Sequence, residues 1–487
     1  MSLLLATCFC SKLGGKTAGM SNNKEKDLVK NTLLFTVGNA GAKLLMLIIV
    51  PLYTYYVSTE QMGQYDLVNT YVGLFSSLAC LALHEGLYRW LLDASTKDKD
   101  ILKTGLLASF IAVVGFDVIA WIFLSVINYT YLPEFILLVT AAAFYTIVQF
   151  ITRGLRNNKI YAVQGIVYSL ALILCNVILV IWLRMQARGL LLSMAFAYIV
   201  TIVFMAVVQH LVKDYVVPGK FDRDLAKDLI KYSLPIVPNN IAWWLVSASN
   251  RIVINWGMGD AANGIYAISM KFPTLVNMLS TFFYQAWQEQ AISEYDSKER
   301  DAYYTKIFNI YVKVLLTGII ALLPVTKFII IYFMDSSYHD AYQFIGLLYL
   351  SSVFNAFAGF YGTGYLSTKK TMGALTTTMW GAIANAVLTV VLINTAGLYA
   401  AAFGSMVGNA IIWVTRIVQT RKYFNIKIEW KAFIILIGLC AAVIVAVNAA
   451  GLAAMIVLEV IACMFFLLVN KELIVPVVKQ IANKAKK

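Results

Sequence analysis

The chain has 487 residues, of which 60% are hydrophobic and 13% are charged, and its formal net charge is +14. Soluble domains are nearer about 45–50% apolar and about 25% charged, so this composition excludes an ordinary water-soluble protein. The Pro-rich, Gly-rich and charged tracts typical of fibrous or disordered proteins are missing from the sequence. The composition therefore predicts an all-α polytopic membrane protein.

Apolar stretches recur along the whole chain. A membrane-spanning helix needs roughly 20 mostly apolar residues, and by that criterion we expect about fourteen spans. They lie near residues 31–53, 64–88, 104–127, 134–152, 160–183, 189–210, 232–256, 264–288, 307–333, 341–366, 371–394, 397–418, 432–449 and 451–470. The longest gap, at 211–231, is too short for a soluble domain.

The basic residues indicate the orientation of these spans. With the N-terminus in the cytoplasm, roughly 32 of the 39 Lys and Arg residues fall on the inner side. This asymmetry follows the positive-inside rule and predicts that both termini are cytoplasmic. Most of the net charge then faces anionic membrane lipids, which argues against nucleic acid as a partner.

Neither the first twenty residues nor the cysteines and histidines show a recognisable functional motif. Residues 1–20 lack the basic n-region of a signal peptide, and we expect either a true start at Met20 or a dispensable extension before it. The six Cys and three His residues show no metal-ligand spacing, so we expect neither a metal nor a cofactor.

Short matches at a nearly constant offset indicate an internal repeat. Offsets of 201, 209 and 208 relate Gly63-Gln64-Tyr65 to Gly264-Ile265-Tyr266, Asn176 to Asn385, and Gly189-Leu190 to Gly397-Leu398. An even number of spans separates the partners, so the halves should be related by a pseudo-two-fold axis along the membrane normal. We expect a cytoplasmic N-terminal segment at 1–29, an N-lobe at 30–212, a cytoplasmic linker at 213–230, a C-lobe at 231–420, and two further helices with a basic tail at 421–487.

Polar residues recur at helical spacing on the first two spans of each half. These stripes are Thr32, Thr36, Asn39 and Lys43; Asp66, Thr70, Ser77 and His84; Asn240, Trp244, Ser247 and Arg251; and Lys271, Thr274, Thr281 and Gln285. A charge inside the membrane costs at least about 2.5–3.5 kcal/mol, so such residues usually face a cavity or a partner. The stripes predict a wet central cavity with surplus positive charge.

Surplus cations favour an anionic ligand such as phosphate or pyrophosphate. The candidate binding residues are Lys43, Arg251, Lys271, Asn39, Ser247, Asp66 and Arg89. The alternative is internal neutralisation, for example of Asp66 by Lys271. Glu85 and Arg89, at i and i+4, form either a structural or gating ion pair with each other or part of the ligand contact.

Several short motifs are distinctive: Tyr232-Ser233-Leu234-Pro235-Ile236-Val237-Pro238, Ser249-Asn250-Arg251, Gly264-Ile265-Tyr266-Ala267, Gln285-Ala286-Trp287, Gly63-Gln64-Tyr65-Asp66, Leu87-Tyr88-Arg89 and the segment from Gly397 to Gly404. Together they resemble the polysaccharide-exporting flippases of the multidrug/oligosaccharidyl-lipid/polysaccharide exporter superfamily. One departure is Asn250, where the family often carries an acid. Arg251 should therefore lack an adjacent counter-ion.

The resemblance implies two six-helix lobes around a cavity lined by the first two spans of each lobe. It also implies export of an undecaprenyl-pyrophosphate-linked oligosaccharide, for O-antigen, capsule or exopolysaccharide, across the bacterial cytoplasmic membrane by alternating access. The protein would then be a transporter and not an enzyme. It would act as a monomer, with polysaccharide assembly proteins as further partners. Transport would be driven by a coupling ion (H⁺ or Na⁺), by the membrane potential or by product removal.

Two other functions remain open. A cation-coupled multidrug exporter of the same superfamily would need embedded acids, and the span at 31–53 holds none. A membrane glycosyltransferase or polysaccharide polymerase would usually need a sizeable loop or ectodomain carrying acids, and the predicted outer loops are short.

Overall fold

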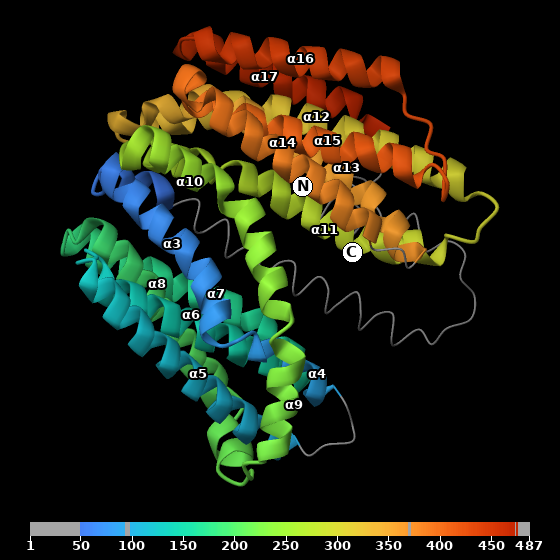
Figure 1. The fold of residues 1–487 in the computed structure, drawn as a ribbon. Coiled ribbons are helices and arrows are strands. Elements are labelled where there is room, and N and C mark those ends of the chain that lie inside the picture. Colours follow the sequence, from blue (N-terminus) through green and yellow to red (C-terminus); the bar gives the residue numbers. More distant parts are fainter. Residues whose placement is uncertain (1–48, 93–97, 369–371, 473, 476–487) are drawn as a thin grey trace, which may run out of the picture. The chain divides into compact units, whose positions relative to one another are not determined.

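The structure, a computed structural model, describes residues 49–92, 98–368, 372–472 and 474–475 (Figure 1). All regular elements in these residues are helical, which confirms the predicted all-α class. Contacts group the described chain into an N-terminal unit, holding residues up to Asn255 together with Gly259–Gly264, and a C-terminal unit, holding Trp256–Met258 and the residues from Ile265 onward. The predicted lobe boundary at 213–230 stays a prediction.

The N-terminal unit contains helices α3 to α9 and most of α10. The bounds are α3 (Thr59–Ala79), α4 (Leu83–Leu91), α5 (Asp98–Val126), α6 (Leu132–Gly154), α7 (Asn158–Asn176), the π-helical η1 (Val177–Trp182), α8 (Gln186–Val208), the π-helical η2 (Leu211–Val216), α9 (Arg223–Ser233) and α10 (Ile236–Ser269). The C-terminal unit contains α11 (Pro273–Ser293), α12 (Arg300–Phe333), the 3₁₀ turn η3 (Ser336–Ala341), α13 (Tyr342–Ser367), α14 (Met372–Ala396), α15 (Leu398–Thr420), α16 (Trp430–Ala449) and α17 (Leu452–Val469).

Ten described helices are long and apolar enough to cross a membrane, and the bent pair α3–α4 adds an eleventh. The predicted span at 31–53 lies almost entirely outside the described residues. The spans predicted at 232–256 and 264–288 fall on α10 and α11, which are not among the ten. The polytopic architecture is confirmed, and the count of fourteen is not.

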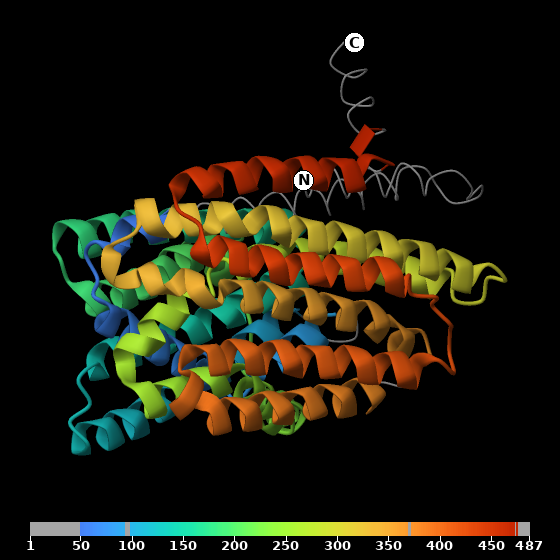
Figure 2. The same cartoon turned by 90° about the horizontal axis from the view of Figure 1, so that it is seen from above.

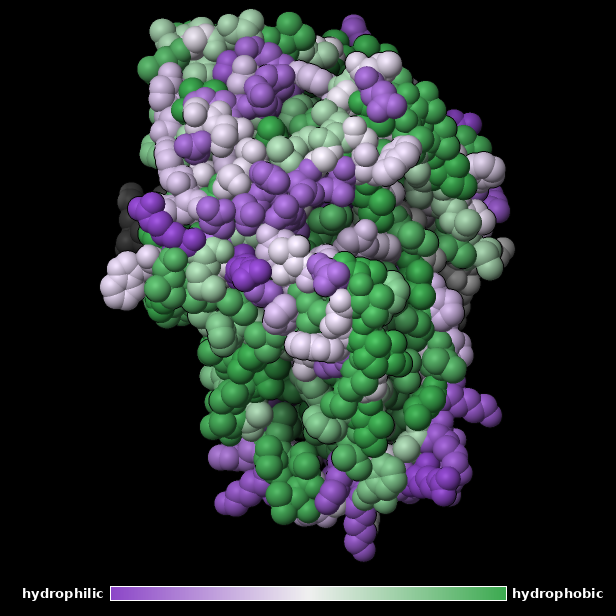
Figure 3. Space-filling model, turned by 60° about the vertical axis from the view of Figure 1, so that its left-hand side comes forward, coloured by the Kyte–Doolittle hydropathy of each residue, from purple (hydrophilic) through white to green (hydrophobic). Residues whose placement is uncertain are grey.

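The apolar surface of the N-terminal unit is that of a protein surrounded by lipid. Along α5, the exposed side chains include Phe110, Ile111, Ile119, Ile122 and Phe123. Figure 3 shows hydrophobic side chains covering this unit in the lower half of the view, with hydrophilic ones gathered at its lower end. Since a helix facing water would expose polar side chains instead, these helices face hydrocarbon.

Two predicted spans are interrupted by breaks that hydropathy does not reveal. The span at 64–88 bends by 56° between α3 and α4, where Leu81 and Ala82 have positive φ. The span at 264–288 breaks between α10 and α11, which places Lys271 at the break. Pro273 begins α11, and its ring lacks the N–H that would continue the α10 ladder. The other stripe residues, Thr274, Thr281 and Gln285, lie on α11, and their common face with Lys271 stays a prediction.

The last two helices pack along α12 (Figure 2). At one end, the Lys327 ammonium donates to the carbonyl oxygens of Val447, Asn448 and Ala450, at 2.7, 3.2 and 2.9 Å. At the other end, Lys313 forms a 2.9 Å salt bridge with Glu429. A cation at a helix C-terminus also offsets the negative end of the α16 dipole. These contacts fix α16 onto α12.

Candidate functional site

The polar stripes predicted for 64–88 and 232–256 meet each other along α3 and α10. The Asn240 amide donates to Ser77 Oγ at 2.9 Å, Trp244 Nε1 donates to the Thr70 carbonyl at 2.7 Å, and Arg251 Nε donates to Asp66 Oδ2 at 2.7 Å. All of these residues belong to the N-terminal unit. The residues of each stripe lie on one face of their helix, and in this structure the polar face of α3 binds directly to that of α10.

Arg251 has a counter-ion on another helix. The Asp66 side chain is 7% exposed and that of Arg251 is 25% exposed, so water screens their charges only partly. Position 250 carries no acid, as the sequence shows, and Asp66 of α3 supplies the negative charge from another helix. The partner suggested for Asp66 was Lys271, whereas the salt bridge is formed with Arg251.

The glycines that revealed the repeat touch each other. A Cβ on Gly63 would lie 1.8 Å from the Asp260 carbonyl oxygen, and a Cβ on Gly264 would lie 1.9 Å from that of Thr59. Thr59 and Asp260 each stand four residues before one of the glycines, so the contact is reciprocal. Reciprocal contacts are what a two-fold axis between the repeats produces. Only glycine permits this backbone approach.

Side-chain hydrogen bonds reinforce the glycine contact. The Gln64 amide donates to Asp260 Oδ2 at 2.9 Å, and the Asn263 amide donates to the Gly63 carbonyl at 3.0 Å. The start of α3 and the segment 259–264 are therefore joined by backbone and side chains together. Gly259, with φ 83°, interrupts α10 just before this segment and allows the chain to turn into it.

The other predicted site residues are placed less completely. Lys271 is partly buried at the α10–α11 break in the C-terminal unit. Glu85 and Arg89 lie one turn apart on α4, Glu85 partly buried and Arg89 exposed, and their pairing and gating role stay predictions. Lys43, Asn39 and the side chain of Ser247 lie outside the described residues.

Arg416 is not among the site residues predicted from the sequence. The guanidinium of this α15 residue donates to Thr377 Oγ1 at 3.2 Å, to Thr378 Oγ1 at 3.1 Å and to the Ala358 carbonyl at 2.7 Å. Among the salt bridges of the described residues, none involves Arg416. A signal was present, because apolar Ile and Val residues flank Arg416 within the predicted span at 397–418.

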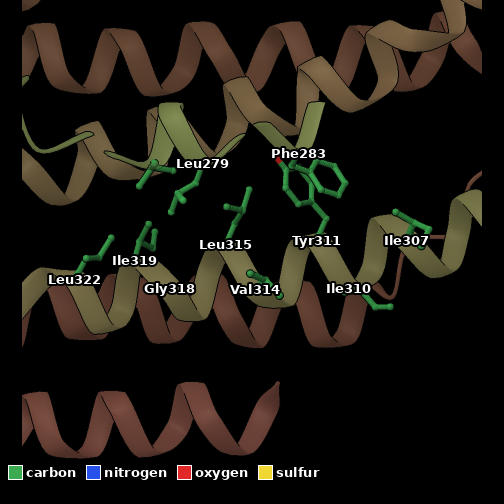
Figure 4. A pocket seen from close by; sticks show the side chains of 11 residues that line it. Leu279, Phe283, Ile307, Ile310, Tyr311, Val314, Leu315, Gly318, Ile319 and Leu322 are labelled. Atoms are coloured by element: carbon green, nitrogen blue, oxygen red, sulfur yellow. The ribbon is translucent and has the colours of Figure 1, made fainter. Parts of the chain in front are cut away.

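A hollow lies between α11 and α12, and it measures about 600 Å³ when the open space at its mouth is included (Figure 4). Its lining is almost wholly apolar and includes Leu279, Leu315, Leu322 and the stacked rings of Phe283 and Tyr311. Such a lining gives an anionic head group no positive charge to bind. This hollow is therefore not a candidate site for phosphate.

Comparison with known proteins places the chain in a family. A model described as polysaccharide biosynthesis protein matches residues 28–288, which is more than half of the sequence. The chain belongs to this family. The matched segment contains both α3 and α10, and hence the Arg251–Asp66 pair of this family member. No curated protein matches the chain.

Solved structures of transporters share the fold of this polysaccharide biosynthesis family member. The lipid II flippase MurJ, in an inward closed conformation, is 12% identical over 91% of this chain and 100% of its own, with a TM-score of 0.68. An inward-facing multidrug resistance MATE transporter of the MOP superfamily is 14% identical over 83% of this chain and 95% of its own, with a TM-score of 0.59. A MOP superfamily transporter from Pyrococcus furiosus, whose binding pocket is described as having reverse polarity, is 14% identical over 81% and 94%, with a TM-score of 0.55.

Proposed function

We propose that this protein is a flippase that moves a polyprenyl-pyrophosphate-linked oligosaccharide across the bacterial cytoplasmic membrane. The cargo would be a repeat unit of O-antigen, capsule or exopolysaccharide, and both termini would be cytoplasmic. The observation that carries this proposal is the polysaccharide biosynthesis family match over 28–288. The MurJ-like fold supports it, since MurJ is a lipid II flippase.

Arg251 has the chemistry to exchange an internal acid for the pyrophosphate of the cargo. In the state described, its guanidinium donates to Asp66, and the α3–α10 interface is closed around the pair. A pyrophosphate offers more acceptor oxygens and more negative charge than one carboxylate, and Arg binds phosphate groups in two-pronged geometry. Cargo entry would release Arg251 from Asp66, loosen the interface and so couple binding to alternating access, with Lys43 and Lys271 as further cations of the cavity.

Transfer of a fluorescent polyprenyl-pyrophosphate glycan between the leaflets of reconstituted vesicles tests this proposal. Arg251→Gln, Lys43→Ala and Lys271→Ala should each slow transfer at least about tenfold, as expected for loss of one charge-assisted hydrogen bond. Lys227→Ala, which removes an exposed cation of α9, is the matched control and should transport normally. Normal transport by all three cavity variants, once shown to be folded, would refute the cationic-cavity mechanism.

A cation-coupled multidrug exporter is the second candidate, since MATE transporters share the fold over 83% of this chain. Such an exporter needs acids available for H⁺, Na⁺ or cationic drugs. Here the buried Asp66 carboxylate is engaged by Arg251, which makes it a poor site for a coupling cation. Vesicles carrying an imposed H⁺ or Na⁺ gradient distinguish the two functions, because accumulation of a hydrophilic organic cation would favour the exporter.

A further inference from the structure

A second hollow of the C-terminal unit lies where α15 ends and α16 begins. Counted together with the open space at its mouth it measures about 650 Å³, and its lining includes Arg421, Asn425, Trp430 and Tyr361 of α13. Because α15 and α16 are both candidate membrane spans, their adjoining ends lie at the level of lipid head groups. All of the residues that line the hollow belong to the C-terminal unit.

The linker that forms one wall is held in place by α12. The Asn309 amide donates to the Lys427 carbonyl at 2.9 Å, and its oxygen accepts the main-chain N–H of Glu429 at 3.0 Å. The Glu429 carboxylate forms its 2.9 Å salt bridge with Lys313 of α12. No acid is among the residues that line the hollow, so Arg421 gives the lining a net positive charge.

Tyr361 brings an unsatisfied polar group to the same place. The residue is 2% exposed, and its hydroxyl is buried with no hydrogen-bond partner in the described part of the chain. Leaving a buried polar group unpaired costs about 1–3 kcal/mol, so such groups usually have a partner. A phosphate oxygen would accept this hydroxyl while also meeting the Arg421 guanidinium.

We propose that this hollow binds the phosphate of an anionic membrane phospholipid. Arg421 would supply the charge, and Tyr361 and Asn425 would donate neutral hydrogen bonds. Trp430 is half exposed at the start of α16, as is typical of tryptophan at a membrane interface. Basic pockets between membrane helices on the cytoplasmic side, the side predicted for this linker, suit anionic head groups.

Native mass spectrometry of the full-length protein in detergent tests the proposal, with phosphatidylglycerol as the anionic lipid and phosphatidylcholine as the zwitterionic comparison. Phosphatidylglycerol should bind more tightly than phosphatidylcholine. Arg421→Gln should weaken the binding of phosphatidylglycerol at least about tenfold, and Tyr361→Phe about fivefold, because each substitution removes one hydrogen bond to phosphate. Lys422→Gln is the matched control, since Lys422 is the adjacent cation and lies over the Tyr423 ring at 5.1 Å. The affinity of Lys422→Gln for phosphatidylglycerol should equal that of the wild type.

Three results would overturn the proposal. Equal binding of the two lipids would remove the role of charge. Wild-type affinity in Arg421→Gln or Tyr361→Phe would show that the lipid binds elsewhere. Displacement of phosphatidylglycerol by an equal concentration of inorganic phosphate would assign the site to free phosphate. Because Arg421 is exposed and Phe preserves the ring of Tyr361, both variants should fold.

Discussion

Neutralising either Asp66 or Arg251 alone should destabilise the protein more than neutralising both. The relevant variants are Asp66→Asn, Arg251→Gln and the double substitution. In the structure, Arg251 Nε and Asp66 Oδ2 are 2.7 Å apart, and the two side chains are 25% and 7% exposed. Each single substitution leaves one buried charge without the partner that the structure gives it.

The magnitude follows from distance and burial. At an effective dielectric of about 20, the attraction at this distance is about 6 kcal/mol, and desolvation of both groups offsets much of it. Removing one partner of a buried pair costs about 3–5 kcal/mol. We expect about 2–3 kcal/mol for Asp66→Asn, because the exposed part of Arg251 can hydrate, and about 3–4 kcal/mol for Arg251→Gln. In the double variant, two amides can hydrogen-bond, and the cost should fall to about 1–2 kcal/mol.

The assay is a double-mutant cycle on the free energy of unfolding, measured by SDS titration of the protein in mixed micelles. The coupling energy between Asp66 and Arg251 should be about 3 kcal/mol or more. Lys227 and Asp224, which form a 2.9 Å pair with side chains 64% and 87% exposed, are the matched control. Their coupling should stay below about 1 kcal/mol. Additive effects at Asp66 and Arg251, with coupling below about 0.5 kcal/mol, would refute the reasoning.

Three further outcomes follow from the packing and capping contacts. Gly63→Ala should abolish transport, because its Cβ would lie 1.8 Å from a backbone oxygen, whereas Gly115→Ala on α5 has no atom within 4 Å and should be neutral in the same vesicle assay. Lys327→Met should lower the free energy of unfolding in SDS by about 3 kcal/mol, since it leaves the α16 carbonyls without their ammonium donor. The Ser337 N–H and hydroxyl hold the pKa of Asp335 below its ordinary value. The stabilisation that the ionised Asp335 cap gives to η3 should therefore be complete above the unfolded pKa of about 3.9 and be lost as the pH falls through the lower folded pKa. Faster hydrogen exchange of the Ser337 amide at low pH would report this loss.

Sequence periodicity recovered the faces of the helices. Two stripes found from spacing alone, one through Asp66 and Thr70 and one through Trp244 and Arg251, form the α3–α10 contacts. The repeat offset of 201 likewise identified Gly63 and Gly264, which touch in the structure. Spacing succeeds here because a helix projects residues four apart onto the same side whatever surrounds it.

Which faces meet, and where helices break, depends on neighbours that spacing does not contain. Leu81 and Ala82 have positive φ although neither is a glycine, and no proline stands at this bend. Their neighbours Cys80 and Leu83 are buried in the core of the N-terminal unit. The environment of Arg416 was missed for a related reason. In the sequence, a cation near the end of a span is indistinguishable from one that only marks the cytoplasmic side. Its hydrogen bonds to Thr377 and Thr378 of α14 become evident only in the structure.

The contact between Lys327 and α16 has a consequence for the order of synthesis. Lys327 is synthesised 120 residues before Val447 and 123 residues before Ala450, whose carbonyl oxygens it binds. Until α16 is inserted, the Lys327 ammonium must remain at the membrane surface, which a long flexible side chain near a helix end can reach. The docking of α16 is thus a late step of biogenesis that completes α12, and a chain arrested before this helix would hold α12 at a shallower depth.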